Sequence, residues 1–199
     1  MKLLRYPATI ALSFLLASPT VAQVSVTAFG GYAVSEGIDN DTSGERASVK
    51  SGGTFGVAAD YDLDGSRQLQ LFYGQQSTVL DLGSGQPRFD LNVRYLHLGG
   101  TYFFEGPIGR GPYAVGGLGV THFTPDLGGL QSETRASLNV GFGYVWPLGS
   151  AVAVRAEARA FLTLLNSSGG LFCSGGCTVV LSGDGFAQGQ AMVGLTARF

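Results

Sequence analysis

The stretch "AVAVRAEARAFLTLL" at residues 151–165 decides the fold, because its apolar and polar side chains alternate. Arg155, Glu157 and Arg159 lie on one face. Composition alone would favour a helix, since Ala, Arg and Glu are good helix formers. Consecutive alternation has the period of a strand and outweighs that preference. We therefore predict a strand whose other face is apolar throughout: Val152, Val154, Ala156, Ala158, Ala160, Leu162 and Leu164.

The same period recurs along the chain in segments separated by Gly, Pro, Asp and Ser. In residues 90–103 the apolar face changes after Tyr95, which indicates a bulge or a different register. The links between segments alternate in length. Residues 63–66, 104–111 and 147–150 form short turns, whereas residues 35–51, 78–89, 124–133 and 166–184 are longer and more polar. The eight predicted strands are 24–34, 52–62, 67–77, 90–103, 112–123, 134–146, 151–165 and 185–199.

An even number of strands with alternating short and long links is typical of an outer-membrane β-barrel. The composition of the polar face separates this fold from a soluble sandwich. That face is mainly Gly, Ala, Ser, Thr, Asn and Gln, and only 13% of the chain is charged. Such residues suit a narrow lumen, while lipid covers the apolar face. We predict an all-β protein, an eight-stranded antiparallel transmembrane up-and-down β-barrel. Candidates for its interfacial aromatic girdles are Tyr32, Tyr61, Tyr102, Phe103, Phe104, Tyr113, Phe123, Tyr144 and Trp146.

The N-terminus has the features of a secretory signal peptide, residues 1–22. Lys2 and Arg5 precede a short apolar run and small residues near Ala22. Cleavage would leave residues 23–199 as one barrel domain. The chain has twelve basic and fourteen acidic residues, and cleavage would remove two basic ones. An acidic chain lacks the clustered cations that nucleic-acid binding requires.

Cys173 and Cys177 are the two cysteines of the chain, and export would bring them to an oxidising compartment. A local disulfide is the leading interpretation, and half of a metal site is the alternative. Asp60, Asp62 and Asp64 match the first half of a calcium loop, but Leu71 stands where a bidentate acid is needed. We expect a strand that runs into a tight turn, with no metal and no cofactor.

The inward face is expected to carry a lumen charge network. An unpaired charge in a lumen of low dielectric is costly, so these side chains should pair with one another. The predicted members are Asp60, Arg94, Arg155, Glu157, Arg159 and Arg198. We interpret the network as a polar plug that holds the barrel closed, in preference to an ion pathway. His97 and His122 show no spacing to a serine and an acid that would indicate catalysis, so an enzyme is not expected.

Three runs resemble the small outer-membrane barrel superfamily that includes the OmpA N-terminal barrel and the OmpX and OmpW types. They are "LHLGGTYFFEGPIGRGPYAVGGLGV" at 96–120, "LNVGFGYVWPL" at 138–148 and "VGLTARF" at 193–199. The resemblance implies location in the cell outer membrane and contact with its lipids. It also implies a C-terminal signal for the barrel-assembly machinery, which Gly194, Ala197 and Phe199 would supply.

The resemblance leaves three functions open. The first is a structural or cell-surface interaction role, with host or surface ligands bound by the extracellular loops at 35–51 and 166–184 and with side chains filling the lumen. The second is a small channel for hydrophobic compounds, as in the OmpW type. The third is an enzyme that modifies lipid.

Overall fold

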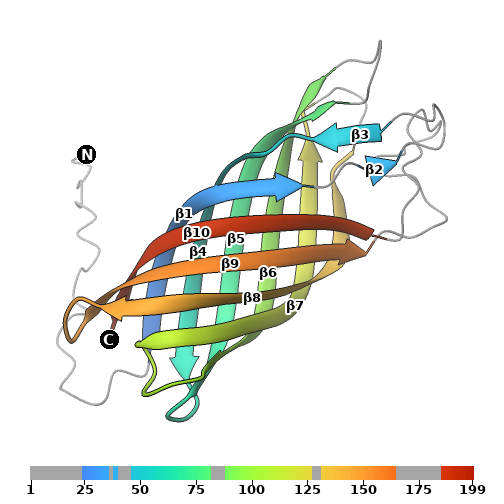
Figure 1. The fold of residues 1–199 in the computed structure, drawn as a ribbon. Coiled ribbons are helices and arrows are strands. Elements are labelled where there is room, and N and C mark those ends of the chain that lie inside the picture. The colour runs from blue at the N-terminus through green and yellow to red at the C-terminus, as the bar shows by residue number, and fades with distance from the viewer. Residues whose placement is uncertain (1–23, 36–37, 40–45, 82–87, 127–130, 165–184) are drawn as a thin grey trace, which may run out of the picture.

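A closed antiparallel barrel is the architecture of this protein in a computed structural model (Figure 1). The structure describes residues 24–35, 38–39, 46–81, 88–126, 131–164 and 185–199. Each long strand pairs with the next, and β1 pairs with β10 to close the barrel. The predicted fold class is thereby confirmed. The long strands are β1 Val24–Ser35, β4 Gly52–Asp62, β5 Arg67–Asp81, β6 Phe89–Phe103, β7 Gly111–Pro125, β8 Glu133–Pro147, β9 Val152–Leu164 and β10 Gly185–Arg198.

Two short strands, β2 Ile38–Asp39 and β3 Arg46–Val49, lie where the sequence predicts only a loop. The pairing of β4 with β5 ends at Gln76, but β5 continues to Asp81. Its exposed edge beyond that point pairs with β3 through Leu80 and Asp81. Unpaired backbone groups at a strand edge favour such an addition. No helix in the described part of the chain is long and apolar enough to cross a membrane.

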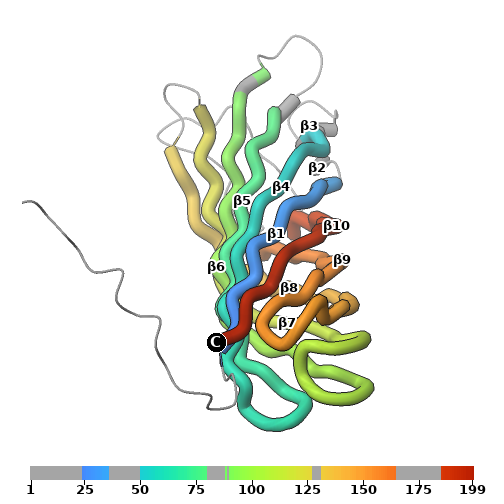
Figure 2. The backbone as a smooth tube through the Cα atoms, turned by 90° about the vertical axis from the view of Figure 1, so that its left-hand side faces the viewer, coloured from blue at the N-terminus to red at the C-terminus, as the bar shows by residue number. Residues whose placement is uncertain are grey.

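The short turns and the C-terminus lie at one end of the barrel (Figure 2). There the amide of Phe199 donates to the carbonyl of Val24, and the amide of Arg198 donates to the carbonyl of Ala151. Short turns mark the periplasmic end of an outer-membrane barrel. The opposite end, toward which β1 and β9 run, is therefore the extracellular end.

Strand β6 has no bulge in its described pairing. Leu91 to Phe103 are in unbroken register with β7, and the register with β5 is also continuous. Leu91, Val93 and Tyr95 face the lumen, whereas Leu96 and Leu98 face outward. The apparent change of face arises because β6 itself carries apolar side chains on its inner face toward the extracellular end. Apolar side chains thus occupy the inner face at one end of the strand and the outer face at the other.

Some of the predicted girdle aromatics lie on the outer face of the barrel wall, and the others lie on its inner face. Tyr32, Tyr61, Tyr102, Phe104, Tyr144 and Trp146 are exposed on the outside, where girdle residues would lie. The girdle prediction is wrong for Phe103, Tyr113 and Phe123, which are buried inside. Their odd-numbered positions share the inward face of β6 and β7, so they fill the lumen instead.

Candidate functional site: the lumen

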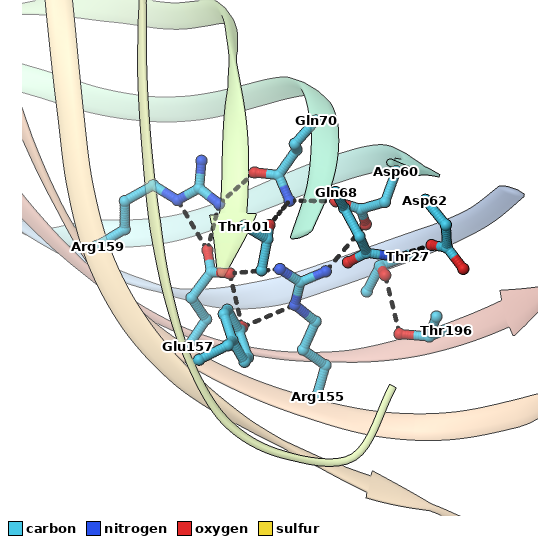
Figure 3. Close-up of polar contacts among 11 residues, drawn as sticks. Thr27, Asp60, Asp62, Gln68, Gln70, Thr101, Arg155, Glu157, Arg159 and Thr196 are labelled. Carbon is cyan, nitrogen blue, oxygen red and sulfur yellow. Dashed lines mark hydrogen bonds and ion pairs between the residues drawn. The ribbon is translucent and has the colours of Figure 1, made fainter. Parts of the chain in front are cut away.

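The periplasmic half of the lumen holds two acids and two arginines that balance in charge (Figure 3). Arg155 Nη1 lies 3.0 Å from Asp60 Oδ2. Arg155 Nη2 is 3.3 Å from Glu157 Oε2, and Arg159 Nη2 is 2.6 Å from Glu157 Oε1. Each of these four residues is buried, with at most 4% of its surface exposed. We call Asp60, Arg155, Glu157 and Arg159 the charge cluster.

The alternation of β9 explains why this cluster forms. A strand of period two directs positions 155, 157 and 159 to the same side, so three charges from one strand enter the lumen together. Tyr113 of β7 accepts a hydrogen bond from Arg155 Nε at 2.7 Å and donates one to Glu157 Oε2 at 2.7 Å. The guanidinium of Arg159 also lies 4.0 Å from the ring centre of Phe72. Each buried charge therefore has several partners, as burial requires.

The charge cluster connects strands that are far apart around the barrel. Arg159 on β9 donates through Nη2 to Gln70 Oε1 on β5, at 2.9 Å. Strands β9 and β5 are opposite each other, because three strands lie between them in either direction around the barrel. Gln70 Nε2 donates in turn to Asp60 Oδ1 at 2.7 Å. These bonds cross the whole width of the lumen.

A second ion pair stands at the periplasmic mouth. Arg198 Nη2 lies 3.0 Å from Asp62 Oδ2, and Arg198 Nη1 donates to the carbonyl of Ile108 at 2.6 Å. Ile108 belongs to the turn between β6 and β7 and is buried in a cluster that includes Phe103 and Val145. This turn consequently folds across the mouth.

The extracellular half of the lumen is held by rings and amides. Tyr95 of β6 stacks on Phe161 of β9 with ring centres 4.2 Å apart. Its hydroxyl donates to Gln188 Oε1 of β10 at 2.7 Å, and Gln188 Nε2 donates to Gln76 Oε1 of β5 at 2.6 Å. We call Tyr95, Phe161, Gln76, Gln188 and Gln190 the aromatic and amide cluster.

A histidine and a serine meet between these two clusters. His97 Nε2 lies 2.7 Å from Ser137 Oγ, and His97 Nδ1 contacts the amide nitrogen of Asn139. Because the amide nitrogen donates, Nδ1 accepts and Nε2 carries the proton that Ser137 receives. A general base would instead have to accept the serine proton. This arrangement therefore leaves Ser137 unactivated.

Sequence reasoning missed this contact, because positions 97 and 137 are 40 residues apart and no motif joins them. The signal that does exist is their inward position on β6 and β8. Asn139 Oδ1 also accepts from Arg159 Nη1 at 3.4 Å, which links the histidine to the charge cluster.

The structure brings together five of the six residues predicted for the lumen charge network and excludes Arg94. Asp60, Arg155, Glu157 and Arg159 form the charge cluster, and Arg198 forms the pair at the mouth. Including Arg94 was wrong, since its side chain is exposed on the outer wall. Val93 and Tyr95, its neighbours in β6, face the lumen, and alternation directs Arg94 the other way.

The three aspartates of the apparent calcium loop have separate partners. Asp60 contacts Arg155, Asp62 contacts Arg198, and Asp64 closes the turn between β4 and β5. Asp64 Oδ1 accepts from the amides of Ser66 and Arg67, each at 2.8 Å. The Ser66 amide and the Arg67 guanidinium lower the pKa of Asp64 from 3.8 to about 2. Among the described residues no three His, Cys, Asp or Glu side chains gather as metal ligands.

The residues of the predicted assembly signal lie on β10 and at the C-terminus. Gly194 packs so closely on β1 that an added Cβ would lie 2.6 Å from the carbonyl oxygen of Ala28. Ala197 pairs with Val26 and Val152, and Phe199 is exposed. Cys173, Cys177 and residues 1–22, the predicted signal peptide, lie outside the described residues.

Fold and site together define a small outer-membrane barrel with side chains bonded across its lumen. The chain belongs to the family described as outer membrane protein beta-barrel domain, whose model matches residues 8–199. The predicted family and the location in the cell outer membrane are confirmed. No curated protein sequence matches the chain.

Solved structures of outer-membrane proteins share the fold. Neisserial surface protein A is 16% identical with a TM-score of 0.59, and the match covers 88% of this chain and 97% of that one. AlkL in lipid bilayers is 15% identical with a TM-score of 0.57, covering 100% and 97%. OprG from Pseudomonas aeruginosa is 16% identical with a TM-score of 0.52, covering 89% and 96%. At these identities the likeness concerns the fold.

Proposed function

We propose that this protein is a barrel with a filled lumen, which has a structural or surface-interaction role carried by its extracellular loops. The observation that supports this most is the set of side-chain bonds between opposite strands. Arg159 reaches Gln70 across the lumen in one half, and Tyr95 reaches Gln188 across it in the other. A solute crossing the membrane would have to break both sets. An eight-stranded barrel is in general just wide enough for its own side chains.

The alternative function, a small channel for hydrophobic compounds, has one observation in its favour. A hollow of about 530 Å³ lies beside Tyr32, Phe142 and Ala160 on the outer wall. However, β9 and β10 are paired without a gap from Gly185 to Ala197 behind it. The hollow therefore faces the membrane, and no break in this paired wall leads from it to the lumen.

Planar-bilayer recording separates the two functions. Purified wild-type protein should produce no reproducible single-channel steps, because both clusters obstruct the lumen. A variant that combines Asp60→Asn, Arg155→Gln, Glu157→Gln and Arg159→Gln provides a comparison in which the charge cluster is removed. Regular steps from the wild-type protein would contradict the filled lumen and support the channel.

The loop role needs its own measurement, because the loops lie largely outside the described residues. Residues 166–184 are replaced by a short Gly-Asn turn, and cells displaying either protein are tested on a panel of immobilised glycans and matrix proteins. We expect the wild-type cells to adhere to at least one member and the shortened variant to lose that adhesion. The shift in gel mobility between boiled and unboiled protein serves as the folding control. Equal adhesion of both proteins to every member would contradict a role for this loop.

We further propose that residues 1–22 are removed on export, that Cys173 and Cys177 form a disulfide, and that Phe199 with Gly194 and Ala197 addresses the chain to the barrel-assembly machinery. The alternation of β10 supports the last point, since Val193, Leu195 and Phe199 are all exposed on the outer side. N-terminal sequencing of the protein from outer-membrane fractions should begin at Gln23. A protein that begins at Met1 would overturn the proposed cleavage.

A further inference from the structure

The outer wall of β5 to β8 changes from apolar to polar within a single step along the strands. Tyr73, Leu96, Val120 and Ala136 are register partners on four adjacent strands, and all are exposed. The next outward positions toward the extracellular end are again register partners and are all polar: Gln75, Arg94, His122 and Thr134. One such step is about 7 Å along a strand.

A second polar row follows the first. Ser77, Asn92 and Thr124 are register partners on β5, β6 and β7. The two rows form a continuous surface, which we call the boundary patch. Because the apolar row below it suits hydrocarbon and the patch does not, the patch lies at the level of the lipid headgroups.

Hydrogen bonds within the boundary patch fix most of its side chains. His122 Nδ1 lies 2.8 Å from Thr134 Oγ1, and Ser77 Oγ donates to Asn92 Oδ1 at 2.8 Å. Gln75 Oε1 accepts from the hydroxyl of Tyr73 at 2.9 Å, which leaves the Gln75 amide nitrogen available. The contact with Thr134 occupies one ring nitrogen of His122 and leaves Nε2 for another partner.

Arg94 is the arginine of the boundary patch and carries its fixed positive charge. Its guanidinium has no ion pair and no side-chain hydrogen bond within the described part of the chain. Asp90, an exposed acid on the same strand, is four residues away, or about 13 Å along β6. A cation thus stands at the edge of the hydrocarbon with no ion-pair partner among the described residues.

The opposite wall of the barrel has no such cation in its described strands. The outward positions of β9 and β10 stay small or apolar to their extracellular ends, as Leu162 and Leu164 show on β9 and Ala187 shows on β10. Val34 continues this apolar surface on β1. The charge is therefore confined to one side of the described barrel wall, and it is not a general feature of the extracellular rim.

We propose that the boundary patch binds the phosphorylated headgroup of an outer-leaflet glycolipid. The guanidinium of Arg94 matches a phosphate with two parallel N–H donors. His122 Nε2 and the amide nitrogen of Gln75 contact phosphate or sugar oxygens beside it. The acyl chains of the same lipid lie on Leu96, Val120 and Tyr73. This site is on the barrel wall and does not depend on the role proposed for the loops.

Native mass spectrometry of the full-length barrel in a neutral detergent tests the proposal. Lipid A that carries both phosphates is titrated onto the wild-type protein and onto Arg94→Gln. We expect Arg94→Gln to weaken binding about fivefold, the effect of one cation near a charged membrane surface. His122→Gln should weaken it less. Arg110→Gln, at an exposed arginine in the periplasmic turn, is the matched control and should leave binding unchanged.

Two further ligands show whether the boundary patch recognises the phosphate of the lipid, its acyl chains or free phosphate. Lipid A without phosphates should bind the wild-type protein as weakly as Arg94→Gln binds the phosphorylated lipid. Inorganic phosphate should compete only at concentrations far above that of the lipid. The proposal fails if a folded Arg94→Gln protein binds like the wild type or if Arg110→Gln loses as much affinity. It also fails if the dephosphorylated lipid binds equally well, or if inorganic phosphate competes at the concentration of the lipid.

Discussion

The two halves of the lumen are enclosed by the same long strands and differ in their chemistry. The charge cluster in the periplasmic half consists of two acids and two arginines, and the aromatic and amide cluster in the extracellular half is uncharged. Both join opposite strands, through Arg159 and Gln70 in one case and through Tyr95 and Gln188 in the other. An ion pair depends on every partner, because a buried charge left alone is costly. A packed ring depends mainly on its volume. The halves should therefore respond differently to single substitutions.

Glu157→Gln is expected to have the largest effect on this comparison. The substitution leaves Arg155 and Arg159 with Asp60 as the remaining acid of the charge cluster. The free energy of unfolding should fall by about 3–5 kcal/mol, the usual cost of breaking a buried ion pair. Urea unfolding of the protein in lipid vesicles measures it. Adding Arg159→Gln should recover part of the loss, and a single-variant loss below about 1 kcal/mol would argue against a tightly coupled cluster.

Tyr95→Phe tests the uncharged half with a smaller change. The ring and its stacking on Phe161 remain, while the hydrogen bond to Gln188 Oε1 is lost. Gln188 Oε1 still accepts from Gln190 Nε2, at 3.1 Å, so no acceptor is left alone. We expect a loss of about 1 kcal/mol in the same unfolding experiment. If Tyr95→Phe cost as much as Glu157→Gln, the distinction between the two halves would be wrong.

Asp64 gives the smallest expected effect, because its carboxylate is exposed to solvent, whereas that of Asp60 is buried. Its pKa in the folded protein is lowered to about 2 from 3.8. The stabilisation it provides is thus complete above pH 3.8 and is lost as the pH falls through about 2. Carbon-13 NMR titration of the carboxyl group in micelles should give a midpoint near pH 2. A midpoint near 3.8 would show that the turn does not hold this carboxylate.

Much of the barrel could be predicted from the sequence. The eight long strands follow from period-two alternation, and the longest difference at their ends is in β5, which reaches Asp81 where the pattern indicated an end at Ser77. The inward position of Arg155, Glu157 and Arg159 also follows from that alternation. The short strands β2 and β3 carry no comparable pattern, because they are additions to the edge of β5.

The site could be predicted only in part. Alternation states which residues share a face, but not which face is the inner one. Where the outer face is apolar along its whole length, as in β9, hydrophobicity settles the question. In β6 the inner face is apolar at the extracellular end, so the same rule placed Arg94 inside. The sequence contains no indication that His97 and Ser137 are in contact, apart from their inward positions. Neither their residue types nor their separation in the chain predicts a pair.

By itself, the sequence determined the number of long strands, their alternation and the membrane environment, because each depends on local periodicity and on the composition of a face. The tertiary structure alone decided which side chains meet in the lumen. Asp60 and Arg155 are 95 residues apart and become partners only when β10 closes on β1. Closure also defines inside and outside for every strand. Arg94 for that reason lies on the outer wall, at the boundary of the membrane, and not in the charge cluster.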